Sequence, residues 1–457
     1  MRLRSARMSA VDAQWYWMSP TMRSDQFLLY GFATASASLE EIAAQVRTHA
    51  VTIDDLCRRV DDVPVGLDRP YWGRAPVTED QVRLTHGPMT WQSCLDRVAA
   101  SIDDQLDARQ RMWRLHLYGP VSAPAGVPGD ALVVAILQIA HALGDGRRSS
   151  AIARKLFGAK ESGGSSAADP VDTLAVPDGR VCPEPLRRAA TALIGALRLP
   201  VDTARMISWG AVAFGRHRRR PAPTTTGVGP TPINRPHGVE RRLRTVTVPA
   251  DALTARGRSV TVGALIAISI ALSRYLGDPR TPVTVTLAVA YEGDRRPVGN
   301  LSRNDFRNVS INLRTDLDNL EERAAAIADA IVAARAAAPD PVIEAGRRAE
   351  HVTPAPLRIL GARQAGRGEP PERIDGISVV SSVNRGPADL ALGGGESVVT
   401  AGFPALSPVH GLNHGIHGIG GRVSISVIAA PDVCPDIDRY MALLSDAVAA
   451  GGGWITA

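Results

Sequence analysis

The chain has 457 residues, enough for two domains, and its 45% apolar and 21% charged content is typical of a globular protein. Its formal net charge of +6 favours anionic partners: a membrane face, an acidic cofactor such as CoA, or nucleic acid. The four cysteines are scattered and form no Cys-x-x-Cys pair, which argues against a disulfide framework or a zinc site. They are expected to be reduced thiols in a cytosolic protein: Cys57, Cys94, Cys182 and Cys434.

The sequence predicts neither a membrane-spanning helix nor a signal peptide. No apolar run reaches about 18 residues, and the basic segment 1–17 lacks the apolar core, about 7–15 residues long, of a secretory signal. We therefore expect a cytoplasmic protein. The positive charge adds the expectation of peripheral contact with the inner membrane face.

The first part of the chain alternates predicted helices and strands. Helices are expected at 38–50, where Ser38 and Glu41 form a capping box, and at 95–109, 147–158 and 184–199. Residues 111–119 alternate with period two, and 131–139 form a near-continuous apolar run, which is typical of a strand buried on both faces. Together these two segments predict a hairpin with a long loop.

The apolar run leads directly into Ala140-His141-Ala142-Leu143-Gly144-Asp145-Gly146. The Gly-Asp-Gly predicts a tight turn, because glycine adopts backbone angles that other residues avoid. His141 is then expected at the end of a rigid core strand, which is how a catalytic base holds its geometry. A hydrogen-bonded core histidine is the alternative interpretation.

Segment 214–238 is rich in proline and arginine and lacks apolar periodicity, so the domain boundary is placed there. The predicted organisation is an N-terminal domain at 1–215, a linker at 216–238 and a C-terminal domain at 239–457. In the second half, helices are expected at 261–277, 320–338 and 436–450, and strands at 282–291, 307–316 and 421–430. Strands and helices interleave without a strict βαβ rhythm, which predicts two α/β sandwiches with mixed sheets.

Three other clusters give weaker signals. His410, His414 and His417 have a spacing at which histidines on a helix can chelate a metal, but intervening glycines argue against a helix, and we expect loop histidines at the rim of a site. The basic run 216–220 lacks the aromatic residues of nucleic-acid-binding modules; a solvated linker or contact with anionic lipid or CoA phosphates fits it better. Neither a Gly-x-Ser-x-Gly nucleophile nor a P-loop is present.

Several segments, in the right order, resemble the bacterial wax ester synthase/diacylglycerol acyltransferase family, which is abundant in actinobacteria. This family belongs to the CoA-dependent acyltransferases of the chloramphenicol acetyltransferase-like fold. The strongest match is His-x-x-x-Asp-Gly at His141, Asp145 and Gly146. The others are the opening segment 18–32, the strand 111–119, TPINRP at 231–236, the helix 259–276, VNRGPADLALGG at 383–394 and the glycine-rich segment 407–427.

The resemblance implies two chloramphenicol acetyltransferase-like α/β sandwich domains with a tunnel between them. It implies an O-acyltransferase that moves a fatty acyl group from acyl-CoA to diacylglycerol or to a long-chain alcohol, giving triacylglycerol or a wax ester. His141 would be the general base. Asp145 would hold the turn with a buried arginine as partner, a plain cap of the next helix being the alternative.

The resemblance also implies the partners. Acyl-CoA is expected as a co-substrate, with no separate cofactor and no metal, and its contact residues are not assigned. The other expected partners are the lipid acceptor and, at the periphery, an anionic membrane or a lipid droplet.

Three departures from the family pattern bear on substrate choice. The family usually has a second histidine where this chain has Ala140, an Asn-Asp pair where it has Gly263-Ala264, and a Ser-Tyr where it has Ile419-Gly420. Two rival interpretations remain beside the acyl-CoA enzyme. One is a polyketide-ester type acyltransferase with a carrier-protein donor, and the other is a catalytically degraded lipid-binding homologue.

Overall fold

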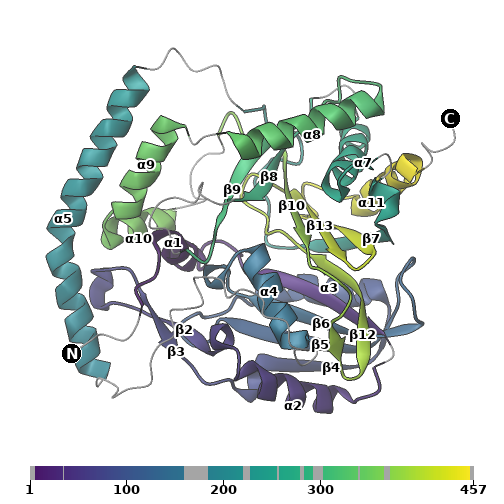
Figure 1. The fold of residues 1–457 in the computed structure, drawn as a ribbon, viewed down its shortest axis with the longest axis horizontal. Coiled ribbons are helices and arrows are strands. Elements are labelled where there is room, and N and C mark those ends of the chain that lie inside the picture. Colours follow the sequence, from purple (N-terminus) through teal and green to yellow (C-terminus); the bar gives the residue numbers. More distant parts are fainter. Residues whose placement is uncertain are drawn as a thin grey trace.

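The computed structural model describes residues 6–33, 35–158, 184–219, 227–254, 257–277, 282–291, 302–337, 340–364 and 371–452. Two six-stranded sheets organise this part of the chain (Figure 1). The first has the order β11 (Ala391–Leu392), β12 (Gly395–Gly402), β1 (Gln26–Ala33), β6 (Ala131–Ile139), β5 (Trp113–Ser122) and β4 (Val82–Met89). The second has the order β7 (Arg242–Pro249), β14 (Arg422–Ala429), β13 (Leu412–Ile419), β10 (Ser378–Asn384), β8 (Thr284–Ala290) and β9 (Phe306–Asn312).

Both sheets are mixed, as the sequence predicts. In the first, β4 is parallel to β5 while β5, β6, β1 and β12 pair antiparallel. In the second, β10 is parallel to both β13 and β8, and the other pairs are antiparallel. The predicted hairpin is confirmed, since β5 and β6 pair antiparallel from Trp113–Ile139 onward.

Some helices pack on the sheets, and others gather beside them, at the left in Figure 1. Those built on the first half are α1 (Ala10–Met18), α2 (Leu39–Ala50), α3 (Trp91–Ser101), α4 (Gly146–Phe157) and α5 (Glu184–Arg218). Those of the second half are α6 (Asp251–Thr254), α7 (Val260–Leu276), α8 (Leu320–Ala336), α9 (Pro341–Val352), α10 (Ala355–Gln364) and α11 (Ile437–Gly452). The short elements are η1 (Asp54–Cys57), η2 (Pro64–Gly66), η3 (Glu79–Gln81), η4 (His141–Leu143) and a hairpin of β2 (Arg58–Asp61) and β3 (Tyr71–Arg74).

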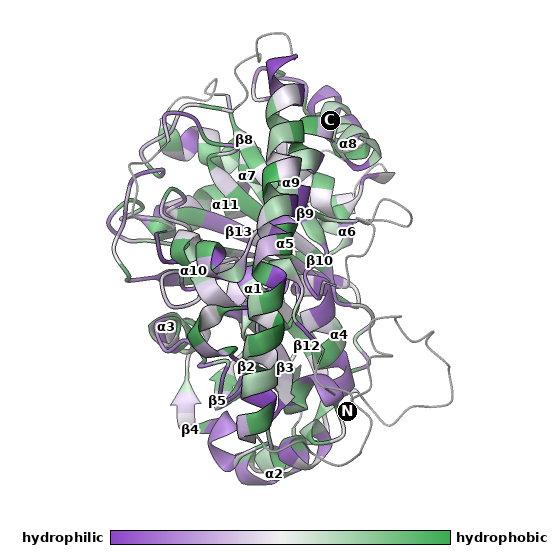
Figure 2. Ribbon diagram, turned by 90° about the vertical axis from the view of Figure 1, so that its left-hand side faces the viewer, coloured by the Kyte–Doolittle hydropathy of each residue, from purple (hydrophilic) through white to green (hydrophobic). Residues whose placement is uncertain are grey.

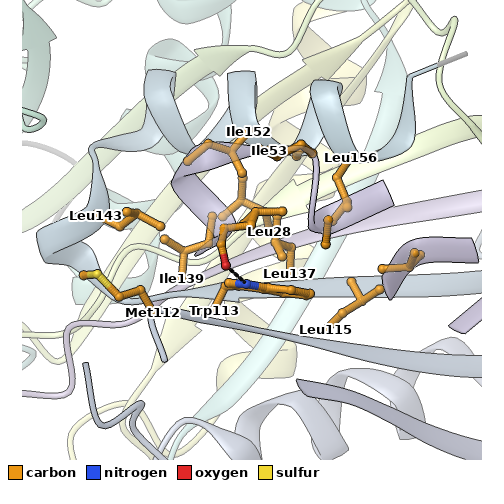
Figure 3. Close-up of a cluster of buried hydrophobic side chains, with 14 of the residues drawn as sticks. Leu28, Ile53, Met112, Trp113, Leu115, Leu137, Ile139, Leu143, Ile152 and Leu156 are labelled. Carbon is orange, nitrogen blue, oxygen red and sulfur yellow. Dashed lines mark hydrogen bonds between the residues drawn. The ribbon is translucent and has the colours of Figure 1, made fainter. Parts of the chain in front are cut away.

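The core of the first sheet is built around Trp113, which is fully buried (Figure 3). Its indole Nε1 donates to the carbonyl of Leu56 at 2.8 Å, so the one polar group of this side chain is satisfied. Leu137 and Ile139 of β6 belong to the same cluster. The strand that ends at the His141 motif is therefore anchored in close-packed apolar surroundings.

The chain crosses between the two sheets late in the sequence. Strand β12, at 395–402, pairs with β1 through Leu28–Gly402 to Ala33–Glu396, so the first sheet is completed by residues from the second half of the chain. The division of the chain at 216–238 stays a prediction. Because β12 belongs to the first sheet, the division into sheets does not coincide with the two halves of the sequence.

Two predicted helices have wrong limits, and the first of them also begins earlier than expected, at Trp91. The helix expected at 95–109 ends at Ser101, because Asp104 and Gln105 instead make tertiary contacts: Asp104 accepts from Arg114 at 2.8 Å and Gln105 accepts from the amide of Ser24 at 3.0 Å. The helix expected at 184–199 continues as α5 through Pro200 to Arg218, and so includes the start of the predicted linker. Pro200 lies on the exposed side, where the carbonyl deprived of its amide partner is open to water.

Candidate active site

The His141 motif joins β6 to α4 through η4. Gly144 has φ of 168°, which is extended backbone, so the expectation that it needs a special conformation is wrong. Glycine is required here because there is no room for a side chain: a Cβ would lie 2.8 Å from the Arg148 side chain. Gly146 is the first residue of α4, and its Cβ would lie 3.3 Å from Val383 of the second sheet. Both glycines therefore allow close packing around the turn.

Asp145 is held by three backbone amides. Its Oδ1 accepts from Arg147 at 3.1 Å and Arg148 at 3.0 Å, which makes it the N-cap of α4. Its Oδ2 accepts from the amide of Asp305 at 2.9 Å, in the segment that leads into β9. Asp145 therefore both holds the turn and caps α4, and its carboxylate also bonds a segment from the other half of the chain.

The segment 302–305 makes several hydrogen bonds to the His141 motif. The carbonyl of Arg303 accepts from the Asp145 amide at 3.2 Å, and Asn304 Nδ2 donates to the His141 carbonyl at 2.9 Å. Asp12 of α1 holds this segment in turn, accepting from Ser302 Oγ at 2.9 Å and from Asn304 Nδ2 at 3.0 Å. Sequence reasoning missed these residues, because no local pattern marks them.

The buried arginine of the site pairs with Asp55 of η1. Arg303 Nη1 lies 2.6 Å from Asp55 Oδ1, and Arg148 Nη2 lies 3.1 Å from Oδ2. Burial raises the pKa of Asp55, but the charges of Arg303, Arg148 and Arg58 outweigh it and hold this pKa below its usual value. The guanidinium of Arg303 also lies 4.8 Å from the centre of the Trp72 ring. The expected buried arginine is present, but it pairs with Asp55, and the hydrogen bonds that Asp145 accepts among the described residues come from backbone amides.

The imidazole of His141 lies flat against Trp15 of α1. The ring centroids are 3.7 Å apart with 10° between the planes, and Phe306 lies on β9 at 6.2 Å. Nδ1 is buried and has no hydrogen-bond partner among the described residues. Burial lowers the pKa of His141, although its own backbone carbonyl and the charge of Asp145 oppose the shift. The ring is therefore neutral near pH 7, the state in which it can accept a proton.

The three late histidines lie on β13 and the turn before it, and the expectation of loop histidines is wrong for His414 and His417. Their side chains are buried, and His414 contacts Ser378 Oγ at 2.9 Å through Nδ1. His410 instead contacts the Gly376 carbonyl at 2.8 Å through Nε2. Within the described ranges, no group of three or more His, Cys, Asp or Glu residues could hold a metal ion.

The departure at Gly263-Ala264 has a packing cause. A Cβ on Gly263 would lie 2.0 Å from the carbonyl oxygen of Leu253, so α7 approaches α6 too closely for any side chain at this position. Ala264 is fully buried in the core of the second sheet. Gly263 therefore belongs to the contact between α6 and α7, and Ala264 to the core.

Two cavities lie away from His141. One of about 220 Å³ is lined by β2, β3 and the start of α5, with Arg59, Asp61 and Arg187 on its walls. The other, of about 430 Å³, lies along α5. The expected tunnel between the domains stays a prediction. A search of the described residues finds no helix with the length and apolarity needed to cross a membrane.

No protein-family model and no curated protein sequence matches the chain. Solved structures do. Wax ester synthase/diacylglycerol acyltransferase from Marinobacter aquaeolei VT8 matches with a TM-score of 0.63 at 16% identity, covering 98% of each chain. Trichothecene 15-O-acetyltransferase from Fusarium sporotrichioides matches with a TM-score of 0.55 at 13% identity, covering 98% of this chain and 95% of that one.

A third structure is the starter condensation domain of rhizomide synthetase RzmA in complex with C8-CoA and Leu-SNAC, with a TM-score of 0.51 at 13% identity, covering 98% of this chain and 94% of that one. These proteins share an architecture across nearly the full length of this chain and little of its sequence. The chain therefore has the chloramphenicol acetyltransferase-like fold of these structures, built on two mixed sheets, as the resemblance implied.

Proposed function

We propose that the protein is an O-acyltransferase that moves a fatty acyl group from acyl-CoA to a hydroxyl acceptor, with His141 as the general base. The observation that carries this proposal is the position of His141: an imidazole at the end of a buried strand, on a turn that both halves of the chain hold in place. That arrangement fixes a base at the meeting of the two sheets.

The chemistry needs a concerted proton transfer. An acceptor hydroxyl is far less acidic than an imidazolium, so His141 must take the proton as the oxygen attacks the thioester carbonyl. The C–O bond forms, the C–S bond breaks, and the proton passes from His141 to the departing thiolate to give CoA-SH. General-base catalysis supplies a factor of about 10²–10⁴, and alignment of the two substrates supplies further acceleration.

Diacylglycerol or a long-chain alcohol is the proposed acceptor, and acyl-CoA the proposed donor without a metal or further cofactor. The resemblance of the His141 motif and its flanking strands to the wax ester synthase/diacylglycerol acyltransferase family supports this choice. We propose a cytoplasmic location, with contact at the inner face of a membrane where such acceptors reside.

The test is an assay of the purified protein with radiolabelled palmitoyl-CoA and either diolein or hexadecanol, run beside His141→Ala and beside His410→Ala as a matched histidine control. We expect ester product from the wild type and from His410→Ala, and a loss of about a thousandfold in His141→Ala. Equal activity in His141→Ala would remove the proposed base, and absence of ester with every acceptor would reject the enzyme.

A lipid-binding homologue without activity is the second candidate, and two observations favour it. Trp15 covers one face of the proposed base, and the chain has Ala140 where the resembled family has a histidine. Saturable binding of diolein or palmitoyl-CoA without turnover would identify this candidate.

A further inference from the structure

Helix α5 presents its apolar side chains to solvent. Of the fourteen large apolar side chains that are exposed in the described part of the chain, seven lie on α5: Leu186, Leu193, Leu197, Val201, Ile207, Val212 and Phe214. Four more lie on η2, α9 and α10, which adjoin α5 or one another: Val65, Ile343, Leu357 and Leu360. A surface helix normally shows the reverse arrangement, with its apolar stripe toward the core.

The exposed residues form one stripe. Leu186, Leu193, Leu197 and Val201 are spaced by seven, four and four residues, which places them on the same side of a helix. Leu197 is 68% exposed and Ile207, further along, is 62% exposed. With its 35 residues α5 is about 50 Å long, and Figure 2 looks directly onto it where it runs down the length of the molecule.

Packing against α9 and several polar contacts attach α5 to the rest of the protein. Arg187 pairs with Asp61 of β2, and Arg198 pairs with Asp68 at 2.9 Å. On the same inner side Gly195 lies so close to the Leu67 carbonyl that a Cβ would be 2.9 Å from its oxygen. The apolar side chains are therefore available for a partner outside the described structure.

The charge of α5 indicates which partner. Between residues 184 and 219 there are seven arginines and two acidic residues, Glu184 and Asp202. Asp202 faces Arg7 at 3.9 Å, on the side toward the protein. Arg205, Arg218 and Arg219 are exposed, and the 430 Å³ cavity joins Leu197 and Val201 to Arg198 and Arg205. A second copy of this chain would bring these arginines against one another, whereas an anionic surface would complement them.

We propose that α5 is a docking surface for an anionic phospholipid bilayer. The helix lies in the plane of the interface, with the Leu186–Phe214 stripe in the acyl-chain boundary and the exposed arginines among the headgroup phosphates. Helix α1, which carries Trp15, contacts α9 and α10 beside this surface, and Arg358 of α10 contacts the Gln14 side chain of α1. The docking surface and the covered His141 therefore lie on neighbouring elements. This inference rests on the membrane contact proposed above and assigns it a surface; flotation tests it separately from the acyl-transfer assay.

Flotation of the full-length protein with vesicles tests the proposal. We expect co-flotation with phosphatidylcholine vesicles that contain about 30 mol % phosphatidylglycerol, weaker co-flotation with pure phosphatidylcholine, and loss at high salt. Leu193→Ser/Leu197→Ser/Ile207→Ser should lower the partition coefficient about a hundredfold. Arg205→Gln/Arg218→Gln should lower it about tenfold on the anionic vesicles alone.

Matched controls come from exposed residues on other faces. Val239→Ser/Val332→Ser removes two apolar side chains that are 60% and 64% exposed, and Arg97→Gln/Arg439→Gln changes the net charge by the same amount as the arginine variant. Both should float like the wild type, and circular dichroism melting should show every variant folded. Absence of flotation by the wild type, or flotation of the triple serine variant at the wild-type level, would overturn the proposal. A light-scattering mass that falls from dimer to monomer in the serine variant, without vesicle binding, would reassign the surface to a second copy.

Discussion

The indole of Trp15 stacks on the imidazole of His141, with the ring centroids 3.7 Å apart. Because Nδ1 has no hydrogen-bond partner among the described residues, this flat contact contributes to the orientation of the ring. The same contact shields the ring from water and so contributes to the burial that lowers the pKa of His141.

We therefore expect Trp15→Leu to act through His141. Loss of the stacked ring admits water, so the pKa of His141 should rise toward its usual value of about 6.5. Since the base must be deprotonated, the acidic limb of the pH–rate profile should move to higher pH, and kcat should fall about tenfold with little change in KM. Trp15→Phe, which keeps an aromatic ring, should retain most of the wild-type kcat and a nearly unshifted pH–rate profile. An unshifted profile in Trp15→Leu would mean that Trp15 only fills space.

Replacing Asp145 should destabilise the whole motif. Asp145→Ala leaves the amides of Arg147, Arg148 and Asp305 without their acceptor, at a cost of about 2–4 kcal/mol in the free energy of unfolding. Urea denaturation measures this change. Asp436→Ala removes a carboxylate that accepts one amide, from Arg439 at 2.9 Å near the start of α11, and should cost about 1 kcal/mol or less. Equal losses in the two variants would contradict the inter-sheet role of Asp145.

A buried carboxylate at the start of β1 should make stability depend on pH. Burial raises the pKa of Asp25 from 3.8 to about 6, although the Leu106 amide and Gln138 oppose the shift. Because the folded pKa exceeds the unfolded one, the folded state binds more protons in this window, and stability falls as pH rises from about 4 to about 6.

The variant Asp25→Asn tests this dependence. An amide oxygen can still accept from Leu106 and Gln138, which both donate to Oδ2, without the cost of a buried charge. We expect it to be more stable than wild type above pH 7, by up to about 3 kcal/mol, and the gain to disappear near pH 4. Thermal melts across this range provide the measurement, with the exposed Asp446→Asn as control. A pH-independent difference would show that folding does not raise the pKa of Asp25.

Gly263 should tolerate no side chain. Gly263→Asn, which introduces the residue of the resembled family, should destabilise by about 2 kcal/mol or more, since its Cβ would overlap the Leu253 carbonyl. Differential scanning calorimetry measures the loss. Gly361→Asn on α10, where a Cβ meets nothing within 4 Å, should cost about 1 kcal/mol or less. A stable Gly263→Asn variant with faster turnover would instead indicate that this position contributes to the active site.

The sequence was sufficient wherever a feature depends on near neighbours in the chain. The capping box at Ser38 and Glu41, the hairpin of β5 and β6 and the position of His141 at the end of β6 were all predictable, because periodicity and capping act within a few residues. The end of α3 and the length of α5 were not, because contacts such as that between Asp104 and Arg114 override local preference.

By itself, the sequence determined the mixed α/β architecture, the buried strand and the place of His141 on it. Only the tertiary structure decided what surrounds that histidine: Asn304 reaches the His141 carbonyl from 163 residues away, Asp145 binds the Asp305 amide, and Trp15 covers the ring. These contacts join segments with no shared periodicity or spacing. They exist because the burial of apolar surface brings α1, β6 and the start of β9 together, and the polar groups thereby removed from water must then find partners in one another.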